Sequence, residues 1–194
     1  MIILLSLLSS AFFSGMEIAY VSSNRLNLEI EKKQKGLIPK LLSIITKDPS
    51  RFISTMLIGN SFALVIYGLF MGQFIVENLS FLFLPSMNEL TTLLLQTIIS
   101  TSLILIAAEF IPKVLFQIYS NLSMKIFSIP AFIFYVILYP ITSLVTITSN
   151  FILKTFFKVT NQESQFSFSK LELENYIENE IDKSDDNLDS EIEI

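Results

Sequence analysis

The stretch FISTMLIGNSFALVIYGLFMGQFIV, residues 52–76, decides the fold, because its 25 residues contain no Asp, Glu, Lys or Arg. A hydrocarbon core about 30 Å thick is crossed by about 20 helical residues, so this stretch is long enough to span a bilayer. Residues 2–21 and 90–111 are similar runs, with one charge each, Glu17 and Glu109. The sequence therefore predicts an all-α integral membrane protein with three spans, at about 2–21, 52–76 and 90–111.

The composition narrows the possible chemistry of the protein. The 194 residues contain no Cys and no His, which excludes disulfides, thiolate or imidazole metal sites and His-based catalysis. Charged residues make up 16% of the chain, against about 25% in soluble domains. We find no Gly-rich phosphate loop, catalytic triad or nucleic-acid patch, and we expect the protein not to be an enzyme.

The placement of Lys and Arg predicts the topology in the cell membrane. Residues 22–51 carry seven Lys and Arg, whereas residues 77–89 carry none. Because cytoplasmic loops are rich in Lys and Arg, residues 22–51 are expected inside and residues 77–89 outside, with the N-terminus outside. The first run lacks the basic start of a signal peptide, so we expect a retained helix.

A fourth apolar run, residues 126–153, is uncharged but contains Pro130 and Pro140. Each proline removes a backbone donor, which suits a broken segment that does not span. A full span would place the tail outside, whereas Lys154 and Lys158 directly after the run favour a cytoplasmic tail. We predict a broken juxtamembrane belt on the cytoplasmic side.

The cytoplasmic loop carries apolar residues at helical spacing among its basic residues. They are Leu26 and Ile30 before Gly36, and Leu37, Leu41, Leu42 and Ile45 after it. This pattern predicts two short amphipathic helices against the inner leaflet, although a solvated basic loop fits nearly as well.

The last part of the chain has a different character. Residues 154–194 hold four Lys and Arg against eleven Asp and Glu. Residues 169–172, SKLE, form a capping box that predicts a helix start. We therefore divide the chain into a transmembrane domain, residues 1–160, and an acidic cytoplasmic linker, residues 161–194.

Polar residues inside membrane runs are costly and often functional. The candidates are Ser6, Ser10, Ser14 and Glu17 in the first run, Gly59, Asn60 and Ser61 in the second, and Ser102 and Glu109 in the third. Spacings of three, four and seven place the members of the first and third runs on shared helix faces. A pocket of hydroxyl, amide and carboxylate oxygens would suit a hard cation such as Mg²⁺, Ca²⁺ or Na⁺, with Gly15 and Gly59 leaving room for backbone carbonyls. Helix packing explains the same residues equally well.

Three short motifs carry a family resemblance. Residues 10–19, SAFFSGMEIA, resemble the S-x-F-F-S-G-x-E-x-A signature of the CorC and cyclin M (CNNM) family. Residues 58–60, IGN, resemble its I-G-N motif, and residues 109–113, EFIPK, resemble its E-x-x-P-K motif. The motifs occur in the family's order, one in each expected span.

The resemblance implies a Mg²⁺ transporter, proposed for the family to export Mg²⁺ in exchange for Na⁺. It implies a homodimeric membrane domain of three spans with a juxtamembrane helical belt. It also implies a following cytosolic CBS-domain pair that binds ATP, to which the acidic linker would lead. The alternative function is a membrane scaffold or regulatory subunit that controls another transporter.

The resemblance also implies a ligand set. The side chains of Ser14, Asn60 and Glu109 and the carbonyls around Gly15 and Gly59 would hold the ion. The supporting cavity would be formed by Ser10, Glu17, Ser61 and Ser102. Two positions depart from the family pattern, because Met16 stands where a smaller residue is common and Ala108 where Gly is common.

Overall fold

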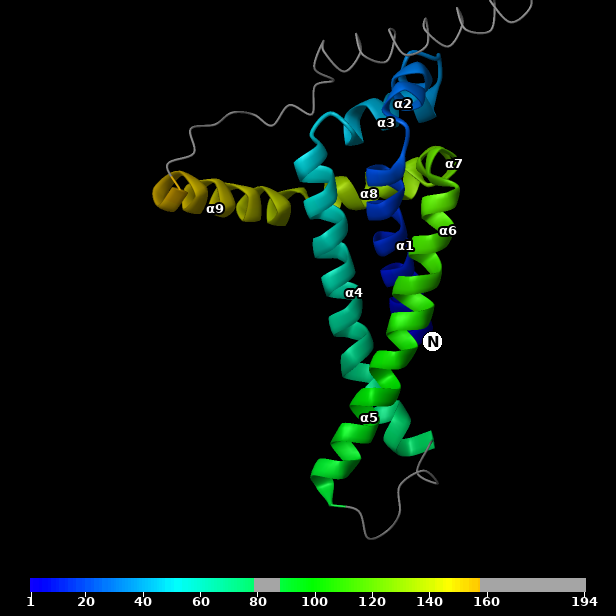
Figure 1. Ribbon diagram of the computed structural model, residues 1–194, viewed down its shortest axis with the longest axis vertical. Coiled ribbons are helices and arrows are strands. Elements are labelled where there is room, and N and C mark those ends of the chain that lie inside the picture. The colour runs from blue at the N-terminus through cyan, green and yellow to red at the C-terminus, as the bar shows by residue number, and fades with distance from the viewer. Residues whose placement is uncertain (79–87, 158–194) are drawn as a thin grey trace, which may run out of the picture. The chain divides into compact units, whose positions relative to one another are not determined.

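The computed structural model describes residues 1–78 and 88–157, and within these ranges the chain forms helices and no strand (Figure 1). This part confirms the predicted all-α class, while the predicted linker, residues 161–194, lies outside the described residues. The helices are α1 (Ile2–Ser22), α2 (Arg25–Lys32), α3 (Leu37–Ile45), α4 (Pro49–Asn78), α5 (Glu89–Ile104), the π-helical turn η2 (Leu105–Phe110), α6 (Ile111–Ile118), α7 (Ser120–Ile126), α8 (Ser128–Ile137) and α9 (Tyr139–Phe157).

Three helices are long and apolar enough to cross a membrane: Ile2–Ser22, Pro49–Asn78 and Glu89–Ile118. They confirm the three predicted candidates, but the third extends beyond residue 111 through the whole of α6. The helix continues past Pro112 because the π-helical turn η2 comes directly before the proline, whose missing amide falls where η2 passes into α6. The residue at which this helix leaves the membrane stays a prediction.

The fourth apolar run is broken, as predicted, although the breaks precede the prolines. Helices α7 and α8 meet at an angle of 65°, around Phe127, and α9 begins after Leu138. Pro130 and Pro140 lie in the first turns of α8 and α9. The backbone amides of a first turn have no hydrogen-bond partner within their own helix, so a proline there removes no helix bond. The prolines thus start helices here. That this segment stays on the cytoplasmic side remains a prediction.

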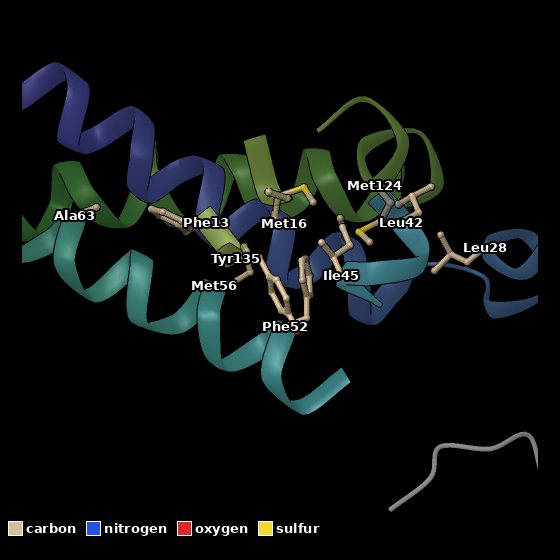
Figure 2. Packing of buried hydrophobic residues seen from close by; sticks show 12 residues of the cluster. Phe13, Met16, Leu28, Leu42, Ile45, Phe52, Met56, Ala63, Met124 and Tyr135 are labelled. Carbon is tan, nitrogen blue, oxygen red and sulfur yellow. The ribbon is translucent and has the colours of Figure 1, made fainter. Parts of the chain in front are cut away.

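Helix α1 lies at the centre of the packing. It contacts α4, η2, α6 and α7. Its buried residues Phe13, Met16 and Ala19 belong to one apolar cluster with Phe52 and Met56 of α4. Figure 2 shows Phe13, Met16, Phe52 and Met56 gathered between the helices. The candidate residues of α1, α4 and η2 therefore lie on elements that pack together, whereas Ser102 is on α5, which packs against α4 and η2.

The two short helices predicted in the cytoplasmic loop are present as α2 and α3. On α3, Leu42 and Ile45 are buried, as the pattern predicted. On α2, Leu28 is buried whereas Leu26 and Ile30 are each 53% exposed, so the contact of these two residues with the inner leaflet stays a prediction. Helix α2 packs against its neighbour α3, and these contacts decide which face of α2 is buried. The spacing of apolar residues within α2 alone does not reveal them.

The start of α9 is fixed to α4 by polar contacts. The buried hydroxyls of Thr55 and Thr142 lie 3.2 Å apart. The Arg51 guanidinium donates to the Tyr139 hydroxyl at 3.2 Å and lies 4.9 Å from the centre of that ring. Such hydrogen bonds join helices within a membrane domain. The residues Met1–Thr148 form one unit, and the rest of α9 belongs to a second.

Candidate functional site

A stripe of buried hydroxyls runs along α1. Ser6, Ser10 and Ser14 are all buried, at helical spacings of four. Ser6 donates to the carbonyl of Ile3, whereas the buried Ser14 Oγ has no hydrogen-bond partner among the described residues. A buried hydroxyl without a partner is costly unless something outside the described chain satisfies it. The Ser14 hydroxyl oxygen is therefore available to a ligand such as a cation, because no described residue bonds to it.

The structure joins the first two motifs directly. The Ser10 hydroxyl donates to Asn60 Oδ1 at 2.6 Å, so α1 and α4 are bonded at the predicted site. This bond holds the amide of the half-buried Asn60 in one orientation. An amide oxygen has two lone pairs, and one of them remains for a cation.

The two glycines of the motifs lie against aromatic rings. A Cβ at Gly59 would come within 2.5 Å of the Phe13 ring, and a Cβ at Gly15 within 2.7 Å of the Phe116 ring. Both glycines therefore allow close packing of α4 and α6 on α1. The expected approach of their carbonyls to an ion stays a prediction.

The third motif contains a π-helical turn, which the sequence analysis missed. In η2 the amide of Ile111 bonds to the carbonyl of Ile106, five residues back. Because Pro112 has no amide hydrogen, the carbonyl of Ala107 lacks both of its usual donors, four and five residues ahead. The sequence feature that could have indicated the π turn is Pro112, which stands about one turn after Glu109 in an otherwise helical run. Ala107 lies two residues before Glu109 along the chain.

Three charged side chains come from elements that pack against one another. Lys113 Nζ lies 3.9 Å from Glu109 Oε2. Glu17 interacts electrostatically with both Lys113 and Glu109. These residues come from α1, η2 and α6, which pack against one another. Lys113 closes the third motif but was not among the candidate site residues, although its spacing of four from Glu109 is a usual one for an ion pair on a helix.

Two of the expected supporting residues lie elsewhere. Ser61 is exposed and donates to the carbonyl of Leu57 on its own helix. Ser102 is also exposed. A π turn uses about one more residue per turn than an α-helix, so η2 shifts the helix faces before and after it. The spacing of seven between Ser102 and Glu109, which would place them on one face of a regular α-helix, therefore does not predict a shared face here.

The two departures from the family pattern are both accommodated. Met16 and Ala108 are fully buried. Met16 packs in the apolar cluster around α1, beside the stripe of hydroxyls. Neither side chain is left in an open space, so both contribute to packing next to the site.

The donors that the site offers are oxygens of several kinds. Among residues 1–78 and 88–157, no group of three or more Asp, Glu, His or Cys is placed to hold a metal. A cation here would depend on hydroxyl, amide and carbonyl oxygens together with Glu109 and Glu17. This donor set suits a hard cation and does not suit a soft one.

The comparisons with known proteins agree with the motifs. The family model described as the cyclin M transmembrane N-terminal domain (CNNM) matches residues 1–190. A search of curated proteins gave no match.

Proposed function

The chain belongs to the CNNM transmembrane-domain family, which is associated with Mg²⁺ transport, and from this premise we propose that it exports Mg²⁺ in exchange for Na⁺. The protein is thus a multi-pass membrane protein of a transporter family rather than of an enzyme family. The transported ion that the family implies is Mg²⁺.

The observation that carries the proposal is the bond between Ser10 and Asn60 beside the unpartnered hydroxyl of Ser14. With Glu109 and the carbonyls around Gly15 and Gly59, these side chains would replace most of the water around a Mg²⁺ ion. Glu17 would add a second negative charge. Two carboxylates match the charge of one divalent cation in a region that screens charge poorly.

Coupling to Na⁺ has an energetic reason. Moving one charge across 100 mV is worth about 2.3 kcal/mol, so moving one Mg²⁺ ion is worth about 4.6 kcal/mol. A potential that is negative inside opposes the export of Mg²⁺ by this amount. Entry of Na⁺ down its gradient could supply the missing free energy.

The direct test is flux through the purified protein in liposomes that contain a Mg²⁺-sensitive dye. We expect Mg²⁺ flux whose rate rises when an Na⁺ gradient is imposed in the opposite direction. The matched measurement uses the same vesicles with K⁺ in place of Na⁺. Mg²⁺ flux that is equal in Na⁺ and K⁺ would rule out the coupling.

One observation favours a second function. Gly59, Gly15 and Ser10 each have a packing partner, which is what a scaffold without an ion site would show. A protein that regulates another transporter would bind no Mg²⁺ between its helices and carry no flux. Flux by the protein alone would therefore exclude this function.

We also propose the topology and assembly expected from the sequence. The N-terminus would lie outside, the tail in the cytoplasm, and two copies would form a homodimer in the cell membrane. A reporter fused after Lys158 should be active only on the cytoplasmic side, because Lys154 and Lys158 are retained there. An external signal from this reporter would make residues 126–153 a true fourth span.

A further inference from the structure

Lys113 is the basic residue that lies among the acidic groups of the candidate ion site. It stands one helical turn after Glu109, with 3.9 Å between Nζ and Oε2, and it also interacts with Glu17. Helix α1 contributes Glu17 and packs against η2 and α6, which contribute the other two. Two carboxylates and one ammonium thus come from three elements in mutual contact, and the closest of these charges are Lys113 and Glu109.

The geometry of this pair suits a contact that can be exchanged. A separation of 3.9 Å is longer than a hydrogen bond between charged groups, so the attraction is mainly Coulombic. The side chains of Lys113 and Glu109 are 40% and 30% exposed, so neither is locked in place. A lysine has a flexible four-carbon stem that lets its ammonium move away while its backbone stays in the helix.

Without a bound ion, the two carboxylates need a positive partner, because repulsion between them is poorly screened at a membrane site. Lys113 supplies one positive charge. When a Mg²⁺ ion binds, the same ammonium would be repelled by the two charges of the ion. The two cations therefore compete for Glu109.

We propose that Lys113 is an internal counter-cation, which neutralises Glu109 while the site is free and leaves it when Mg²⁺ enters. This inference rests on the proposed Mg²⁺ function. Its consequence is a Mg²⁺ affinity that is lower than the ligands alone would give. A transported ion must also leave its site, so this competition favours release.

The test compares Mg²⁺ binding to the purified chain and to its Lys113→Gln variant by calorimetric titration with MgCl₂. We expect Lys113→Gln to bind Mg²⁺ more tightly, by up to about fivefold, which corresponds to the upper value of a partly exposed ion pair. The variant should also have a lower melting temperature without Mg²⁺, because Glu17 and Glu109 then repel each other without compensation. The stabilisation by added Mg²⁺ should be correspondingly larger.

The matched control is Lys32→Gln. Lys32 pairs with Glu29 on α2 at 2.6 Å, away from the site, so its loss should leave the Mg²⁺ affinity unchanged. Lys113→Arg keeps the charge and should not bind Mg²⁺ more tightly than the wild type does.

The outcomes separate the two proposals. If the wild type does not bind Mg²⁺, the proposed function fails and this inference fails with it. If the wild type binds but Lys113→Gln binds equally or more weakly, only the counter-cation role is wrong. If Lys113→Gln is too unstable to purify, the double variant Glu109→Gln/Lys113→Gln should recover stability. Continued instability of the double variant would overturn the pairing.

Discussion

Replacing Glu109 by Gln should reduce Mg²⁺ binding by at least about 10–100-fold, because even groups that only orient a metal ligand are worth this much in affinity. The substitution keeps the size of the side chain and removes its charge. Binding is measured by calorimetric titration, and flux by the liposome assay. The matched control is Glu89→Gln, an exposed carboxylate near the start of the same long helix, which should bind Mg²⁺ as the wild type does.

Asn60→Ala should weaken binding to a similar extent, since it removes the amide oxygen that Ser10 orients. It also breaks the bond between α1 and α4, so a loss of binding has two possible causes. Ser10→Ala separates them, because it breaks the same bond and keeps the amide oxygen. We expect Ser10→Ala to weaken binding less than Asn60→Ala does. Equal affinities for the wild type and Asn60→Ala would remove Asn60 from the site.

Gly59→Ala should destabilise the protein by about 1–3 kcal/mol, the usual cost of overpacking a well-packed interior. The added methyl would lie 2.5 Å from the Phe13 ring, which is held in the apolar cluster and has little room to move. The measurement is the midpoint of thermal unfolding of the purified protein in detergent.

Gly68→Ala is the matched control on the same helix. A Cβ at Gly68 meets no atom within 4 Å, so the substitution should leave the stability unchanged or raise it, since Ala favours helices by about 1 kcal/mol over Gly. The variant Gly59→Ala/Phe13→Leu, which replaces the ring by a smaller side chain, should recover part of the loss. A Gly59→Ala protein that melts like Gly68→Ala would mean that Phe13 does not pack on Gly59.

Much of the fold could be predicted because length and hydropathy are properties of single segments. The uncharged run of residues 52–76 is too long for anything but a span, and the structure forms a helix there from Pro49 to Asn78. The same holds for the motif residues, whose order along the chain indicated the family that the comparison shows. What the sequence did not predict was local, such as the π turn before Pro112 and the continuation of the third helix to Ile118.

The sequence by itself determined the class of protein, the number of candidate spans and the oxygen-only donors of the site, because these follow from which residues are present and how far apart they stand. Only the tertiary structure decided which donors meet. It bonded Ser10 to Asn60 and turned Ser61 and Ser102 to exposed faces. The reason is that the rotation of each helix is set by contacts with its neighbours, such as Phe13 on Gly59, and by the π turn before Pro112. Spacing along one helix contains neither kind of information, and so it could not reveal that α6, which carries Lys113, packs against α1, which carries Glu17.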